Sequence, residues 1–218
     1  MGGACRAGSA VTASARATLL ARGLRLEYLT VGWNVIEGLT AVGAGAVAGS
    51  IALVGFGVDS FVETISGAIL LWRLQAEAGG GADDERLEHV ERRAERLVGV
   101  SFAILAAYVA FEAIRNLADQ EHAAASPVGI ALTAVSIAVM LWLARAKRET
   151  GEALGSRALI ADSHQTYACW YLSVTTLTGL ALNAVFGLWW ADPAAALVIA
   201  VFLVREALEA WHGEEDRG

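Results

Sequence analysis

The sequence has few of the residues that mark a soluble, a secreted or a nucleic-acid-binding protein. Only 18% of its 218 residues are charged, whereas soluble domains average about 25%. Its two cysteines, Cys5 and Cys169, lie far apart, which excludes a disulfide framework and a zinc-finger motif. Acidic residues outnumber basic ones, which gives a net charge of −7 and a pI of about 5.1, so a nucleic-acid partner is not expected.

Catalytic motifs are also missing from the sequence. It contains no phosphate-binding glycine loop, no HExxH element and no nucleophile–base pair. We therefore do not expect an enzyme, and we expect no tightly bound cofactor. The residues in excess are hydrophobic ones, at 56%, and glycine, with 23 residues. This hydrophobicity excludes a disordered chain.

Apolar runs long enough to cross a bilayer fill most of the chain. A helix needs about 20 mostly apolar residues to span a hydrocarbon core of about 30 Å. Six stretches reach or approach this length, at residues 28–48, 51–74, 97–117, 128–144, 158–189 and 193–210. We therefore predict an all-α membrane protein with six transmembrane helices, in preference to a large soluble helical bundle.

Basic residues gather on one side of these six predicted helices. Fifteen of the sixteen lie before the first helix, between the second and third, between the fourth and fifth (Lys147 among them), or at the C-terminal end. The positive-inside rule then predicts that both termini are cytoplasmic. We expect the protein to lie in the cytoplasmic (inner) membrane. We expect a cytoplasmic arm at 1–25, a transmembrane domain at 26–212 with a cytoplasmic loop at 76–96, and a short tail at 213–218.

Two acids lie inside the predicted helix at 51–74. Asp59 and Glu63 are four residues apart, which puts both carboxylates on one helix face. Charge inside a bilayer is costly and usually marks function. Like charges this close repel each other unless a cation lies between them or one carboxylate is protonated. The pair indicates a cation site, the alternative being two acids that line a water-filled vestibule.

A short repeat points to partner residues in the predicted helix at 158–189. The pattern Gly-Ser-x-Ala-Leu begins at Gly49 and again at Gly155, an offset of 106 residues. The same offset carries the acid pair onto Gln165 and Cys169. Matching polar positions in internal repeats are typical of transporters. Two carboxylates, an amide oxygen and a thiolate suit a divalent transition metal. We therefore predict a metal site formed by Asp59, Glu63, Gln165 and Cys169.

Other polar residues have secondary roles in this prediction. Asp162 lies one turn before Gln165 on the same stripe of its helix. Asn34 and Glu37 lie near the middle of the helix at 28–48, where they either line the ion path or form hydrogen bonds between helices. His164 points about 100° away from Gln165 around the helix, so we do not expect it in the site.

Two features near the helix ends have purely structural interpretations. Glu112 and Arg115, three residues apart, are predicted to pair. Asp192, directly before Pro193, is typical of a helix N-cap, so we predict that it caps the last helix.

These motifs resemble the cation diffusion facilitator, or cation efflux, transporters. The resemblance rests on Gly49-Ser50-x-Ala52-Leu53 with Asp59-x-x-x-Glu63, and on Gly155-Ser156-x-Ala158-Leu159-x-Ala161-Asp162. Asn34 and Asp192-Pro193 fit the pattern too, and the similarity covers about residues 26–211. It implies a homodimer of six-helix subunits with both termini inside, which exports metal ions in exchange for protons.

The sequence departs from the family pattern in three places. The family carries His or Asp, and then Asp, at the positions of Gln165 and Cys169. A sulfur ligand shifts the preference away from Mg²⁺ or Ca²⁺ and towards Zn²⁺, Cd²⁺ or copper. Phe56 stands where the family commonly has an acid that matches Asp162. The chain stops just after the last helix, so we expect a short form without the family's cytoplasmic C-terminal domain.

The sequence therefore predicts a transporter of Zn²⁺ or a similar divalent transition metal, which exchanges metal for protons by alternating access. Its expected partners are the metal cation, protons, the lipid bilayer and a second copy of the chain. Two rival hypotheses are a membrane receptor or scaffold that binds metal without moving it, and a carrier of a non-metal cation.

Overall fold

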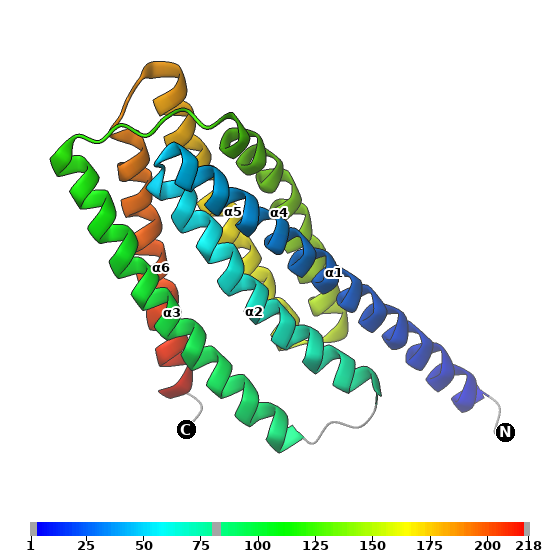
Figure 1. The fold of residues 1–218 in the computed structure, drawn as a ribbon. Coiled ribbons are helices and arrows are strands. Elements are labelled where there is room, and N and C mark those ends of the chain that lie inside the picture. The colour runs from blue at the N-terminus through cyan, green and yellow to red at the C-terminus, as the bar shows by residue number, and fades with distance from the viewer. Residues whose placement is uncertain (1–3, 80–83, 216–218) are drawn as a thin grey trace.

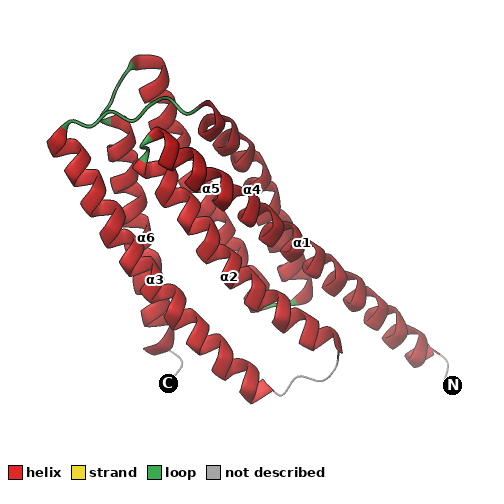
Figure 2. Ribbon diagram, in the orientation of Figure 1, coloured by secondary structure: helices red, strands yellow, loops and turns green. Residues whose placement is uncertain are grey.

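The computed structural model describes residues 4–79 and 84–215, and within this part of the chain every element is a helix (Figure 2). The helices are α1 (Ala4–Ala48), α2 (Ile51–Gly79), α3 (Asp84–Asp119), α4 (Pro127–Leu154), α5 (Arg157–Phe186) and α6 (Ala191–Glu215). The predicted all-α fold class with six helices is therefore confirmed.

The six helices pack side by side along a common direction (Figure 1). They associate mainly in pairs, α1 with α2, α4 with α5, and α3 with α6. The start of α1, the end of α6 and the α4–α5 turn lie at one end of the bundle, which we name the terminal end. The α1–α2 turn and the connections α3–α4 and α5–α6 lie at the other end, named the loop end.

Four helices are long and apolar enough to cross a membrane, over Ala15–Ala48, Ile51–Trp72, Pro127–Leu154 and Ala158–Phe186. Within the described residues α3 and α6, where we expected spans at 97–117 and 193–210, do not meet this criterion. They nevertheless run alongside the other four (Figure 1). Each also exposes large apolar side chains, such as Phe111 on α3 and Val201 on α6, which suits contact with lipid.

Helix boundaries differ from the apolar runs at several places. α1 passes through residues 25–26, the expected border between arm and transmembrane domain, without a break. α2 continues to Gly79 and α3 begins at Asp84, so the described part of the expected loop at 76–96 is helical. α4 continues past the apolar run at 128–144 to Leu154. The basic residues that follow that run therefore lie within a helix and not in a loop.

The repeated Gly-Ser element forms two tight turns between helices. Gly49 and Gly155 have φ angles of +69° and +66°, in the left-handed region where glycine carries no steric penalty. The serine that follows each glycine caps the next helix. Its hydroxyl accepts a hydrogen bond from the backbone N–H three residues on, at 3.1 Å in α2 and 3.4 Å in α5. The repeat thus builds two helical hairpins, α1–α2 and α4–α5, with the matching polar positions at equal distances from their turns.

Asp192 caps α2, so the prediction that it caps the last helix was wrong. α6 begins at Ala191, and Asp192 lies inside its first turn. The buried carboxylate accepts hydrogen bonds from the Ser50 hydroxyl and, at 3.0 Å, from the backbone N–H of Ile51. Asp192 therefore fastens α6 to the α1–α2 turn. The other structural prediction is confirmed, because Glu112 and Arg115 form an ion pair at 2.9 Å.

Candidate metal site

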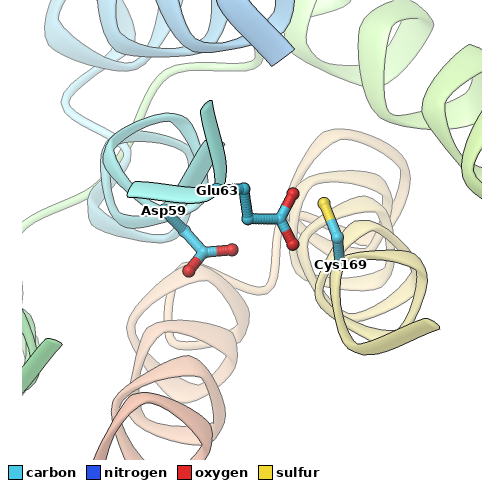
Figure 3. Close-up of side chains that lie close together, drawn as sticks. All are labelled: Asp59, Glu63 and Cys169. Carbon is cyan, nitrogen blue, oxygen red and sulfur yellow. The ribbon is translucent and has the colours of Figure 1, made fainter. Parts of the chain in front are cut away.

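Three potential metal ligands converge between α2 and α5. Asp59 and Glu63 on α2 and Cys169 on α5 each offer one ligand atom, and these atoms all lie within 4.8 Å of one another. Figure 3 shows the Glu63 carboxylate between the Asp59 carboxylate and the Cys169 sulfur. The residues are 3%, 7% and 0% exposed, so the cluster is closed off from the surface of the bundle. The structure thus brings together three of the four residues predicted to form the site.

Close packing of α1 against α2 brings polar residues of α1 to this cluster. Gly57 on α2 faces α1 so closely that a Cβ atom there would lie 2.8 Å from the Cβ of Ala41. That distance is far below an ordinary carbon–carbon contact, so only glycine permits this approach of the two helices.

Asn34 of α1 contacts the cluster directly. Its Nδ2 donates a hydrogen bond to Oε2 of Glu63 at 3.1 Å. The Oδ1 of the same amide is buried and has no hydrogen-bond partner. A buried acceptor without a donor costs roughly 1–3 kcal/mol. A cation bound beside Glu63 is one group that would satisfy it.

Glu37 of α1 lies beside the cluster within a shell of donors. Its carboxylate accepts hydrogen bonds from Ser60 of α2 at 3.0 Å, from Trp33 at 3.3 Å and from Ser136 of α4. The Cys169 thiol is a further donor, with its sulfur 3.9 Å from Oε2. Glu37 therefore links α1, α2, α4 and α5 around the three ligands. Glu37 was expected either to line the ion path or to form hydrogen bonds between helices, and the structure shows the hydrogen bonds.

Gln165 lies one turn nearer the terminal end than the three ligands. α2 and α5 run in opposite directions, so residues that follow Glu63 on α2 face residues that precede Cys169 on α5. The Ser66 hydroxyl accordingly donates a hydrogen bond to Oε1 of Gln165 at 3.1 Å. His164, its neighbour in sequence, is exposed, in line with its expected absence from the site.

A buried ion cluster near the site was not predicted. Lys147 of α4 is fully buried, with its ammonium 3.1 Å from Oε1 of Glu27 and in contact with the carboxylate of Asp162. Asp162 is therefore paired with lysine and lies apart from the three ligands. A signal was present in the sequence, because Lys147 continues by one turn the buried stripe formed by Met140 and Leu143.

Further acidic side chains lie around the three ligands. Glu37 and, on α6, Glu206 lie near enough to Asp59 for their carboxylates to repel its charge. Among the side chains that the structure describes, none of the ion pairs joins a basic group to Asp59 or Glu63. Two adjacent buried carboxylates are stable only with a bound cation or with added protons.

Residues 29–211 match the family of cation efflux transmembrane domains. The chain belongs to this family. An uncharacterized transporter of Methanocaldococcus jannaschii is 24% identical to this cation efflux protein over 185 residues, which make up 83% of the chain and 64% of the relative. An uncharacterized transporter of Synechocystis is 28% identical over 158 residues, or 72% of the chain and 51% of the relative. The chain thus spans between half and two thirds of the length of these relatives.

Family membership confirms the resemblance seen in the Gly-Ser repeat and the polar positions that follow it. It also identifies the cation efflux protein as a multi-pass membrane protein, in agreement with its four strongly apolar helices.

Proposed function

We propose that this cation efflux protein transports a divalent transition metal, with Zn²⁺ or a similar ion as substrate. One observation carries the proposal. Two carboxylates and one thiol lie within 4.8 Å of one another, buried among apolar helices, and the ion pairs of the described side chains include neither carboxylate. Oxygen and sulfur ligands at this spacing are typical of Zn²⁺ sites, whose usual coordination is tetrahedral. The relatives' names and the family support cation transport as the activity.

The ligand set favours a soft metal over Mg²⁺ or Ca²⁺. Those hard cations take six or more oxygen ligands, whereas the cluster has two carboxylates and the sulfur of Cys169. Three protein ligands leave a fourth position open, which lets an ion both enter and leave. We assign that position to an amide oxygen, from Asn34 beside Glu63 or from Gln165 one turn towards the terminal end.

We further propose that the metal exchanges for protons. A metal binds deprotonated ligands, so metal binding releases protons and protonation releases the metal. Without a metal, Asp59 and Glu63 are too close to remain charged together in a buried site. The Gln165 amide does not titrate, so the protons bind at Asp59, Glu63 and Cys169.

The two hairpins provide the moving parts of an alternating-access mechanism. The ligands come from α2 of one hairpin and α5 of the other, so a rocking of α1–α2 against α4–α5 opens the site to either end of the bundle. Export, cytoplasmic termini and a homodimeric assembly, as the family resemblance implies, complete the proposal.

The proposal is tested by metal flux into proteoliposomes that contain only this protein. Zn²⁺, Cd²⁺, Mn²⁺ and Mg²⁺ are compared with and without a pH gradient, for the wild type and Asp59→Asn. We expect flux of Zn²⁺ and Cd²⁺ that responds to the gradient, and no flux in Asp59→Asn protein that elutes as the wild type does. Asp119→Asn, at an exposed acid that ends α3, is the matched control and should transport normally.

Three outcomes would contradict the proposal. Metal binding without flux in folded protein would favour a receptor or scaffold. Normal flux in Asp59→Asn, or flux of an organic cation without metal flux, would remove the acid pair or the metal from the mechanism.

A further inference from the structure

Among the side chains that the structure describes, the ion cluster around Lys147 is the largest set of buried charges outside the metal site. Lys147, the only lysine in the sequence, is 0% exposed. Its ammonium lies 3.1 Å from Oε1 of Glu27 on α1 and 3.3 Å from the Thr166 hydroxyl on α5, and it contacts the Asp162 carboxylate. The ammonium thus occupies a pocket of two carboxylates and a hydroxyl, the kind of place that a metal cation would take.

This cluster lies on the axis of the metal site, displaced towards the terminal end. Asp162 precedes Cys169 by seven residues on α5, which corresponds to about 10 Å along the helix. Glu27 precedes Asn34 by the same interval on α1, so both helices give the same displacement. α2 borders the cluster as well, because a Cβ atom at Gly67 would lie 3.6 Å from Oε2 of Glu27. The four helices around the metal site therefore also surround Lys147.

The two ion pairs of Lys147 differ in what they connect. The pair with Asp162 lies within one hairpin, since α4 and α5 are joined by a tight turn. The pair with Glu27 joins α1 to that hairpin and so connects the two hairpins. If the hairpins separate at the terminal end, the Glu27–Lys147 pair must break. Removing one partner of a buried ion pair is costly, because the other charge is left uncompensated.

We propose that the Glu27–Lys147 ion pair is the gate that closes the metal site towards the terminal end. While the pair is formed, it holds the two hairpins together, and the ammonium blocks cations from the carboxylates of Glu27 and Asp162. This inference depends on the proposed transport function, because a gate is needed only if the metal moves through the site. Its test needs no metal and no flux, so a failed gate and a failed transport proposal give different results.

Cys169 provides a natural reporter of the opening. It is fully buried, and the only other cysteine in the sequence is Cys5. In a Cys5→Ser background, a membrane-impermeant maleimide is added to either face of sealed vesicles of known orientation, without metal. A Cys169→Ser variant that keeps Cys5, near the start of α1, identifies the terminal-end face.

Three variants separate a gate from a general loosening of the fold. Glu27→Gln removes the charge that links the hairpins, and Glu27→Asp keeps the charge on a shorter side chain. Glu152→Gln is the matched control, because Glu152 pairs with Arg148 at 2.9 Å on the surface of the same hairpin, where both side chains are more than half exposed.

We expect Glu27→Gln to raise the rate of Cys169 labelling from the terminal-end face about tenfold, since losing the pair shifts the population towards the open state. Labelling from the opposite face should stay equal or fall. Glu152→Gln should match the wild type, and Glu27→Asp should be labelled more slowly than Glu27→Gln. The gate is contradicted by an unchanged rate, by an equal rise from both faces, or by equal labelling of the Asp and Gln variants.

Discussion

The sulfur of Cys169 makes a quantitative prediction about metal preference. Cys169→Ser keeps the size of the side chain and replaces a soft ligand with a neutral hydroxyl. Structural Zn²⁺ sites with four ligands bind with roughly 10–16 kcal/mol, or about 3 kcal/mol per ligand. Since every 1.4 kcal/mol is tenfold in affinity, the loss of one of the three clustered ligands should weaken Zn²⁺ binding about 100-fold. Mn²⁺ prefers oxygen ligands, so its affinity should fall less than about tenfold.

Isothermal titration of the detergent-purified protein in a Cys5→Ser background measures both affinities. Thr176→Val is the control, because Thr176 lies two turns further along α5 and its hydroxyl is buried without a hydrogen-bond partner. That variant should bind both metals as the wild type does. The reasoning is refuted if Cys169→Ser binds Zn²⁺ normally, or if it loses affinity for Zn²⁺ and Mn²⁺ by the same factor.

Two further predictions concern the packing that holds the site. Asp192→Ala removes the carboxylate that accepts from the Ser50 hydroxyl and the Ile51 N–H, and it should destabilise the protein by about 1–3 kcal/mol, seen as a lower midpoint of thermal unfolding. An unchanged midpoint would mean that these bonds carry no stability. Gly57→Ala forces α1 away from α2 and should lower the midpoint and weaken Zn²⁺ binding together, at a cost of about 1–3 kcal/mol. Gly43→Ala, at a position on α1 with nothing within 4 Å of the added Cβ, should change neither quantity, and equal effects of the two alanines would contradict the packing argument.

Features that depend on local sequence were predictable. The acid pair lies on one face because of the helical repeat alone, and the Gly-Ser turns follow from the conformational freedom of glycine and the capping ability of serine. The position of Cys169 followed from the internal repeat. The structure adds that Cys169 lies close to Asp59 and Glu63 in space.

The position of Gln165 shows where the repeat argument stops. An offset in sequence pairs Asp59 with Gln165, as if the two helices ran in the same direction. The helices are antiparallel, so Cys169 lies beside the acid pair. Gln165 lies one turn further towards the terminal end, where it contacts Ser66. Six spans with both termini on one side already make these two helices antiparallel, so the error lay in pairing positions by offset without taking helix direction into account.

The Lys147 cluster was missed for a different physical reason. An apolar run measures how much of a helix faces lipid or core, and the run in α4 ends before Lys147 although the helix continues. A hydropathy scale gives lysine the same polar score whether it is paired inside the bundle or exposed in a loop. Its partner Glu27 likewise lies just before the apolar run of α1. The cap from Asp192 to α2 was hidden because its partners lie more than a hundred residues away in the sequence.

The central claim is that Asp59, Glu63 and Cys169 together hold the metal. X-ray absorption at the zinc edge, on the zinc-loaded Cys5→Ser protein, tests it most directly. The account predicts one sulfur neighbour at about 2.3 Å beside oxygen neighbours at about 2.0–2.2 Å, with the sulfur lost in Cys169→Ser. A zinc ion with only nitrogen and oxygen neighbours in the Cys5→Ser protein would contradict it.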